Sequence, residues 1–111
     1  MEYQRNGITL LPYEGRNQVE LIRTKEANNY KSSFWVTFLR AKQMGRQIKT
    51  GESGVRIIKV VSNTYTDDNG QVKNRSGIKS YIVFNLDQTT GGEVFNPVIP
   101  ESVKAVEFLF H

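Results

Sequence analysis

The pattern over residues 55–86 constrains the fold most, because two strand-forming stretches flank a tight turn. Residues 55–61 are rich in branched side chains and apolar on both faces, which is typical of an interior strand. Asp67-Asp68-Asn69-Gly70 predicts a hairpin turn, since Asn-Gly accepts the positive φ angles that such turns demand. Residues 78–86 alternate, with Ile78, Ile82, Phe84 and Leu86 on one face and Lys79, Tyr81, Val83 and Asn85 on the other. We therefore expect an antiparallel sheet built around these two strands.

Residues 62–77 connect the two strands, and we expect them to form a variable hairpin loop. Residues 70–77 are polar and basic, which fits either a mobile excursion or a short outer strand. Lys73 and Arg75 in this segment either extend a surface that contacts a partner or only keep the loop in contact with water.

Two helices are expected before this hairpin. Asn17 is a candidate N-cap for the first, because Glu20 three residues later completes a capping-box pattern. An apolar stripe then continues through about Asn28. The second helix is short, with Thr37 as its candidate N-cap and Gly45 as its stop, since glycine adopts the conformation that ends helices.

The length predicts a single domain over residues 1–111, since such a chain removes roughly two thirds of its unfolded surface from water. Residues 1–12 are expected to form an extended N-terminal arm. Residues 102–110 fit a helix and a strand equally well. The predicted fold class is α+β: a curved antiparallel sheet of three to five strands with two helices packed on one face.

The residue content argues against an enzyme. The chain has no cysteine, and its one histidine is His111, so thiolate chemistry, a metal cluster and a histidine base lack their side chains. Residues 45–54 lack the Gly-Lys-Ser/Thr ending of a phosphate-binding loop. Asp67 and Asp68 are adjacent acids in a turn, where such residues are usually structural. We therefore expect no catalysis, no metal and no cofactor.

The N-terminal residues predict neither export nor a membrane anchor. Residues 1–6 lack an apolar leader, and no window approaches the ~18 apolar residues of a membrane span. The lack of cysteine mildly favours a reducing compartment. We therefore expect a cytoplasmic protein with no membrane partner.

Positive charge is concentrated in residues 31–59. This segment holds seven lysines and arginines against Glu52 alone, a balance of +6 in a chain whose net charge is +4. The rest of the chain is therefore net acidic. The same segment carries Trp35, the only tryptophan. Cations beside an aromatic ring are typical of a surface that attracts phosphates and stacks bases.

Eight residues are the candidate DNA contacts: Trp35, Lys42, Arg46, Lys49, Gly51, Lys59, Lys79 and Tyr81. The lysines and the arginine would follow the phosphates, although such charges are more often only solvated. Gly51 would shape a turn whose amides meet a phosphate, or simply a turn. Tyr81 is expected to stack on a base, because its strand face also carries Lys79 and Asn85 and so lacks an apolar cover. Trp35 is equally expected to stack on a base or to lie in the hydrophobic core.

Four stretches of the chain together are similar to one known family. They are Tyr13-Glu14-Gly15-Arg16-Asn17, Trp35-Val36-Thr37-Phe38 with Ala41-Lys42 and Gly45, Ile48-Lys49-Thr50-Gly51-Glu52-Ser53-Gly54, and Tyr81-Ile82-Val83-Phe84-Asn85-Leu86-Asp87-Gln88. In this order they resemble the N-terminal domain of ArdC-type antirestriction proteins; related domains occur in TraC-type plasmid primases. The resemblance implies an α+β domain of plasmids, phages and other mobile elements that binds single-stranded DNA.

The resemblance also sets a limit. In full-length ArdC-type proteins this domain precedes a metalloprotease-like domain with a His-Glu-x-x-His motif, which the present sequence does not contain. No metal or peptidase role is therefore implied.

Two hypotheses of function remain. The first is non-catalytic binding of single-stranded DNA, in antirestriction or as an accessory to DNA processing, with a DNA-processing or host-defence protein as a further partner. The second is a protein-binding module that inhibits a host-defence enzyme without binding DNA.

Overall fold

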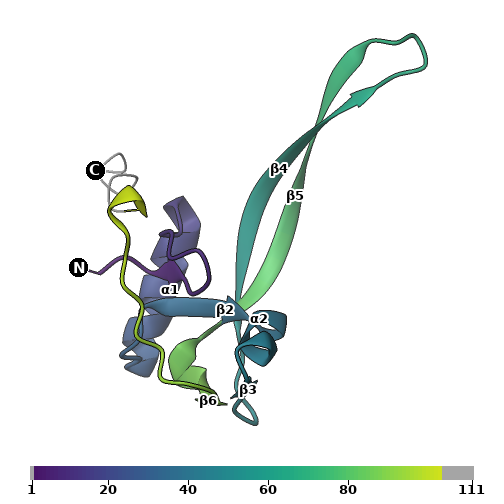
Figure 1. Ribbon diagram of the computed structural model, residues 1–111. Coiled ribbons are helices and arrows are strands. Elements are labelled where there is room, and N and C mark those ends of the chain that lie inside the picture. The colour runs from purple at the N-terminus through teal and green to yellow at the C-terminus, as the bar shows by residue number, and fades with distance from the viewer. Residues whose placement is uncertain (1, 104–111) are drawn as a thin grey trace.

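The computed structural model describes residues 2–103, and its centre is a four-stranded mixed sheet with the strand order β1-β2-β5-β4 (Figure 1). Its strands are β1 (Arg5–Asn6), β2 (Phe34–Thr37), β4 (Val55–Thr66) and β5 (Val72–Asn85). β1 is parallel to β2, and the other pairs are antiparallel. Two short strands, β3 (Arg46–Ile48) and β6 (Thr89–Gly91), form a separate antiparallel pair.

The fold also contains the helices α1 (Gly15–Asn28) and α2 (Phe38–Gln43) and the 3-10 helix η1 (Leu86–Gln88). The predicted α+β class and the curved sheet are confirmed, although the parallel β1 makes the sheet mixed. Among residues 2–103, no helix is long and apolar enough to cross a membrane.

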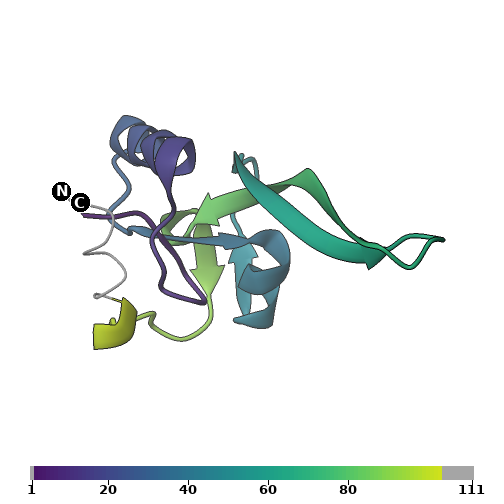
Figure 2. The same cartoon turned by 90° about the horizontal axis from the view of Figure 1, so that it is seen from above.

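The two α-helices contact the sheet from opposite sides, where we expected both on one face. Leu21 of α1 packs in a cluster with Trp35, Ile57 and Val83, whereas Ala41 of α2 packs in a second cluster. The second cluster also contains Val36 and Leu86. Trp35 and Val36 are consecutive in β2, so their side chains point to opposite faces. Figure 2 shows α1 and α2 on either side of the sheet.

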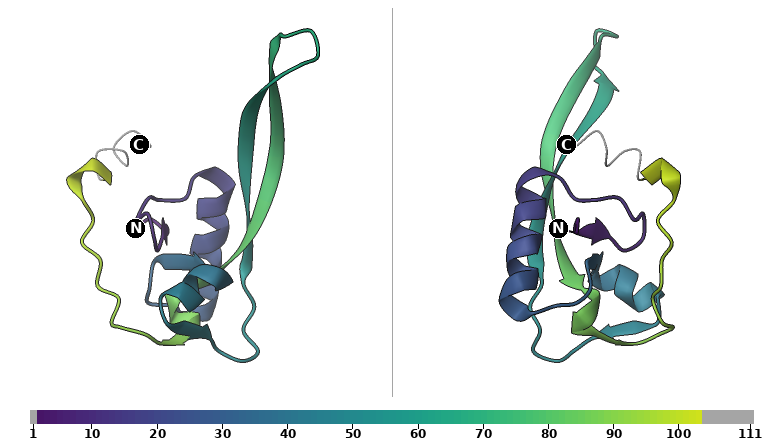
Figure 3. Two further views of the ribbon diagram at one scale, coloured as in Figure 1. Left: turned by 45° about the vertical axis from the view of Figure 1, so that its right-hand side comes forward. Right: turned by 90° about the vertical axis from the view of Figure 1, so that its left-hand side faces the viewer.

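The most conspicuous element is the long hairpin formed by β4 and β5, which projects from the rest of the molecule (Figure 3). Its ladder is continuous from Val55 opposite Val83 to Thr66 opposite Val72. The molecule accordingly measures 54 × 33 × 26 Å along its principal axes. Most of the segment expected to be a loop thus continues the two strands.

The expectation that β4 is an interior strand was wrong. Within the described residues, β4 pairs with β5 alone and lies at the edge of the sheet. Ile57 is buried, but Ile58 and Val60 are 45% and 72% exposed. Although residues 55–61 are apolar on both faces, only one face of β4 is covered, and only where the hairpin joins the body of the protein.

The predicted turn at the tip of the hairpin is confirmed. The Oδ1 atom of Asp67 accepts hydrogen bonds from the backbone N–H groups of Asn69 and Gln71, each at 2.9 Å. Gly70 has a φ of 79°, which glycine adopts readily. The hydrogen bond from Gln71, together with those from Lys73 and Asn69, lowers the pKa of the Asp67 carboxyl.

The short helix begins and ends as predicted. The Thr37 hydroxyl accepts a hydrogen bond from the backbone N–H of Arg40 at 3.2 Å, and Gly45 has a φ of 75°. The expected cap at Asn17 was wrong, because α1 begins earlier and its N-cap residue is Glu14. Most of the segment 102–110, expected to be either helix or strand, lies outside the described residues.

Candidate nucleic-acid interface

One face of the hairpin gathers cations and tyrosines, because side chains alternate between the two faces of a strand. In the ladder, Ile57 lies opposite Tyr81 and Lys59 opposite Lys79. Farther out, Asn63 lies opposite Arg75 and Tyr65 opposite Lys73. We call this surface the basic face: Lys59, Tyr65, Lys73, Arg75, Lys79 and Tyr81, all exposed. It brings together three of the eight predicted contacts.

Near the body of the protein, the basic face offers a lysine pair beside a tyrosine. Lys59 and Lys79 are direct cross-strand neighbours, so their like charges repel each other at short range. Tyr81 follows two residues after Lys79 on the same face and is 39% exposed. An anion placed between the two lysines would relieve their repulsion, and the tyrosine ring is accessible for stacking.

Toward the tip, the cations of the basic face have partners within the hairpin. The guanidinium carbon of Arg75 lies 4.8 Å from the centre of the Tyr65 ring, a cation–π contact. The ammonium of Lys73 lies 3.3 Å from the Asp67 carboxylate. The ammonium groups of Lys59 and Lys79 have no such partner within the described part of the hairpin.

The structure excludes Trp35 from this surface. The ring is fully buried, and its indole N–H donates a hydrogen bond to Oε1 of Gln4 at 2.9 Å. Tyr30 contacts it edge to face with ring centres 6.2 Å apart. Of the two roles considered for Trp35, stacking on a base is excluded and the core position is confirmed. The ring belongs to the core, and its single polar atom has a buried acceptor.

The remaining predicted contacts do not join the basic face. Arg46 holds β3 to β6 and to the residues after β6, because its guanidinium donates to Oγ1 of Thr89 and to the carbonyl of Glu93. Lys42 lies on α2, against the opposite face of the sheet. Lys49 and Gly51 are exposed in the connection from β3 to β4, where Gly51 has a φ of 84°. The basic block of the sequence is thus divided between both sides of the sheet.

Tyr65 is the contact candidate that sequence reasoning missed. Its signal was the continuation of the two-residue period, since residues 73, 75, 79 and 81 place cations and a tyrosine on one face. The polar residues 70–77 fit either a mobile excursion or a short outer strand, so the sequence pattern alone did not place Tyr65 beside Lys73.

The opposite face of the hairpin is aliphatic and exposed. Its members nearest the body are Ile58, Val60, Ile78 and Ile82. They are 45%, 72%, 72% and 42% exposed. From Ile58 outward this face carries no charged side chain, so the two faces of the hairpin differ in both charge and polarity.

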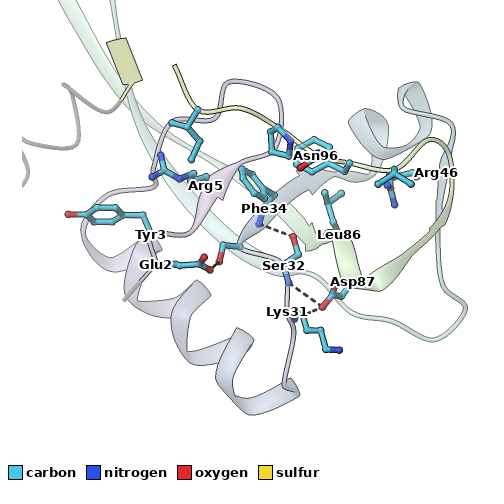
Figure 4. Close-up of a pocket in the computed structure, with 15 residues that line it drawn as sticks. Glu2, Tyr3, Arg5, Lys31, Ser32, Phe34, Arg46, Leu86, Asp87 and Asn96 are labelled. Carbon is cyan, nitrogen blue, oxygen red and sulfur yellow. Dashed lines mark hydrogen bonds between the residues drawn. The ribbon is translucent and has the colours of Figure 1, made fainter. Parts of the chain in front are cut away.

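An open depression of about 870 Å³ lies between the N-terminal arm, the start of β2 and residues 94–99 (Figure 4). The rings of Phe34 and Phe95 meet in its wall with centres 5.0 Å apart. Asp87 accepts hydrogen bonds from the backbone N–H groups of Lys31 and Ser32.

The two carboxylates in this wall, Glu2 and Asp87, accept internal hydrogen bonds. A hydrogen bond from Ser33, followed by one from Lys25, lowers the pKa of the Glu2 carboxyl. The lining contains the carboxylates of Glu2 and Asp87 as well as cations, so the depression does not present the uniform positive charge that a DNA strand requires.

Comparison with known proteins gave one family. The model of the N-terminal domain of the anti-restriction factor ArdC matches residues 1–85. No curated protein matches. The metal-free crystal structure of the antirestriction ArdC protein from the R388 plasmid is 35% identical, with a TM-score of 0.64 over 74% of this chain. The Mn(II)-bound structure of that protein is 29% identical, with a TM-score of 0.67 over 84% of this chain. The present chain spans only 30% and 32% of those two chains.

Proposed function

This chain belongs to the family of N-terminal domains of the anti-restriction factor ArdC, and on that premise we propose that it binds single-stranded DNA without catalysis. The binding serves antirestriction, or DNA processing, for a plasmid, phage or other mobile element. The observation that carries the proposal is the basic face of the β4–β5 hairpin, where Lys59, Lys79 and Tyr81 lie together.

The mechanism combines phosphate attraction with base stacking. Lys59 and Lys79 attract two phosphates of an unpaired strand and release the counterions condensed on it. The exposed ring of Tyr81 stacks on a base, a contact worth roughly 1–3 kcal/mol. Every base has a flat face, so we expect little sequence preference. The affinity should fall steeply with salt.

The test is fluorescence anisotropy of a labelled, unstructured oligonucleotide titrated with the protein at several salt concentrations. Lys79→Glu should weaken binding and flatten the salt dependence, since one phosphate contact is lost. Tyr81→Ala should weaken binding by roughly 5- to 150-fold, corresponding to about 1–3 kcal/mol. Tyr81→Phe keeps the ring and should bind nearly as well as the wild type.

Arg40→Glu is the matched charge control, because Arg40 is exposed on α2, against the other side of the sheet. This variant makes the same change in net charge as Lys79→Glu. If both variants lose the same affinity, the attraction is general and the basic face is not the site. An affinity for the oligonucleotide that does not change with salt would contradict binding through phosphate contacts.

The competing function is a protein-binding module that acts on a host-defence enzyme without DNA. The exposed aliphatic face of the hairpin favours this alternative, because such faces commonly contact proteins. Protection of transforming DNA from restriction separates the two hypotheses. If Lys79→Glu loses DNA binding but protects as well as the wild type, the protein-binding function holds.

A further inference from the structure

The outer edge of β4 has an uncovered stretch with a defined beginning. The backbone N–H and C=O of Ile58 point away from β5, because both form hydrogen bonds with the side chain of Asn17. In an antiparallel ladder this direction recurs at every second residue, so the backbone groups of Val60, Ser62, Thr64 and Thr66 also point outward. No strand among residues 2–103 pairs with this edge. The free edge therefore starts after Ile58 and ends at Thr66, where the turn begins.

This free edge carries Lys59 but lacks two of the usual protections against pairing. Edge strands of natural sheets are commonly interrupted by proline or by bulges. The twelve consecutive residues of β4 contain no proline, and their register with β5 has no bulge. A two-stranded ribbon without a further layer is only marginally stable in water. The outer half of the hairpin projects beyond both helices, so an added strand would stabilise it (Figure 1).

The free edge is complementary to itself. When two copies run antiparallel around a two-fold axis at Asn63, Val60 of one copy lies opposite Thr66 of the other, and Ser62 opposite Thr64. The outward backbone groups of both copies then meet over the full free length. The side chain of Asn17 stops the pairing at one end, and the turn at Asp67 stops it at the other.

Charge favours the same register. The axis at Asn63 brings Asp67 of one copy opposite Lys59 of the other, whereas an axis at Ser62 would place Tyr65 opposite Lys59. The Asp67 carboxylate lies just past the paired residues and already contacts Lys73 of its own copy, so its attraction to Lys59 adds to the backbone pairing without extending it. The aliphatic face is neutral from Ile58 outward, so it adds no repulsion between copies.

We propose that the free edge of β4 pairs with the same edge of a second copy of this chain, and so forms a four-stranded antiparallel sheet with its two-fold axis at Asn63. The axis is perpendicular to the sheet, so the basic faces of the two copies lie on the same side and form one continuous surface. The pairing itself does not depend on DNA binding.

The first test is the molar mass of the chain in solution, measured by light scattering over a range of protein concentrations. The wild type should approach twice 12.7 kDa as the concentration rises. Ser62→Pro removes an outward N–H from the free edge and leaves the ladder with β5 intact. This variant should remain a monomer. A wild type that stays a monomer at every concentration overturns the proposal.

The matched control is Ser76→Pro, because Ser76 lies directly opposite Ser62 and its N–H points outward from the other edge of the hairpin. This variant should dimerise like the wild type. If it is monomeric and Ser62→Pro is dimeric, the partner uses β5. If both variants are monomeric, the assignment to the β4 edge is wrong. The fluorescence of buried Trp35 verifies that each variant folds.

A cross-link tests the axis without disturbing the edge. The chain has no cysteine, so Asn63→Cys introduces a single thiol. At the two-fold axis the two Cα atoms would lie about 4.5 Å apart, within the range of a disulfide. Mild oxidation should give a covalent dimer with Asn63→Cys and little with Arg75→Cys, its partner across the hairpin. Equal cross-linking of both variants, or none of Asn63→Cys, contradicts the register.

Discussion

The side-chain amide of Asn17 forms two hydrogen bonds with the backbone of Ile58. Its Nδ2 donates to the carbonyl oxygen of Ile58 at 2.7 Å, and its Oδ1 accepts from the Ile58 N–H at 3.0 Å. The amide thus satisfies one residue of β4 in the way that a neighbouring strand would. It joins the first turn of α1 to the hairpin where the hairpin leaves the body.

Replacement of Asn17 by alanine should loosen this junction. Two hydrogen bonds at a partly exposed position contribute about 1 kcal/mol of stability, so urea unfolding should show a loss of that size. Exchange of the Ile58 amide with deuterium should become faster. Asn28→Ala is the control, because its side chain donates only to the carbonyl of Thr24 within α1. An unchanged exchange rate at Ile58 would contradict the role of Asn17.

Replacement of Gln4 by leucine should destabilise the core around Trp35. Gln4 is 1% exposed and accepts the indole hydrogen bond, so leucine leaves a buried donor without a partner. The expected cost is about 1–3 kcal/mol in the free energy of unfolding, measured by the fluorescence of Trp35 in urea. Gln47→Leu, at an exposed position of β3, should change the stability little. Equal losses in both variants would argue against the buried hydrogen bond.

Two glycines of the hairpin region should respond oppositely to alanine. A Cβ atom at Gly54 would lie 2.8 Å from the carbonyl oxygen of Val83, so Gly54→Ala should cost about 1–3 kcal/mol. A Cβ atom at Gly77 would meet nothing within 4 Å. Gly77→Ala should be neutral or stabilise by a few tenths to about 1 kcal/mol, because it restricts the unfolded chain. Thermal unfolding compares the two variants, and a tolerated alanine at 54 would refute the close approach.

Alkaline pH should weaken the fold through Tyr13. Burial raises the pKa of the Tyr13 phenol to about 12, whereas the unfolded chain ionises it near 10. Between these values only the unfolded state releases the proton. The stabilisation is therefore complete below pH 10 and decreases as the pH rises toward 12, by at most roughly 3 kcal/mol.

Urea unfolding at pH 8, 10 and 11 measures this decline. Tyr13→Phe has no phenol at this position and should lose less stability than the wild type over the same range. Parallel pH curves for the two proteins would mean that Tyr13 ionises normally in the folded state.

The sequence predicted the elements whose signals are local. The tip turn depends on Asn69-Gly70 and the short helix on Thr37 and Gly45, and each acts within a few residues of its own position. Such features form in the same way whatever surrounds them. The alternation of residues 78–85 likewise showed which side chains share a face.

The predictions that were wrong concern features that depend on residues far away in the sequence. The burial of Trp35 requires Gln4 and α1 on the same side of β2, which no spacing in the sequence reveals. Asn17 is a residue type that commonly caps helices, but its side chain binds the backbone of Ile58, 41 residues away. The apolar pattern of β4 suggested an interior strand. Its edge position follows from the strand order, which the pattern does not contain.

The facing lysines at positions 59 and 79 give the unliganded hairpin an internal conflict. Their repulsion opposes the very strand pairing that positions them, and a polyanion removes it. Binding of such a polyanion should therefore stabilise the strand pairing of the whole β4–β5 hairpin. Proteolysis of the hairpin should then become slower even at residues far from the bound polyanion.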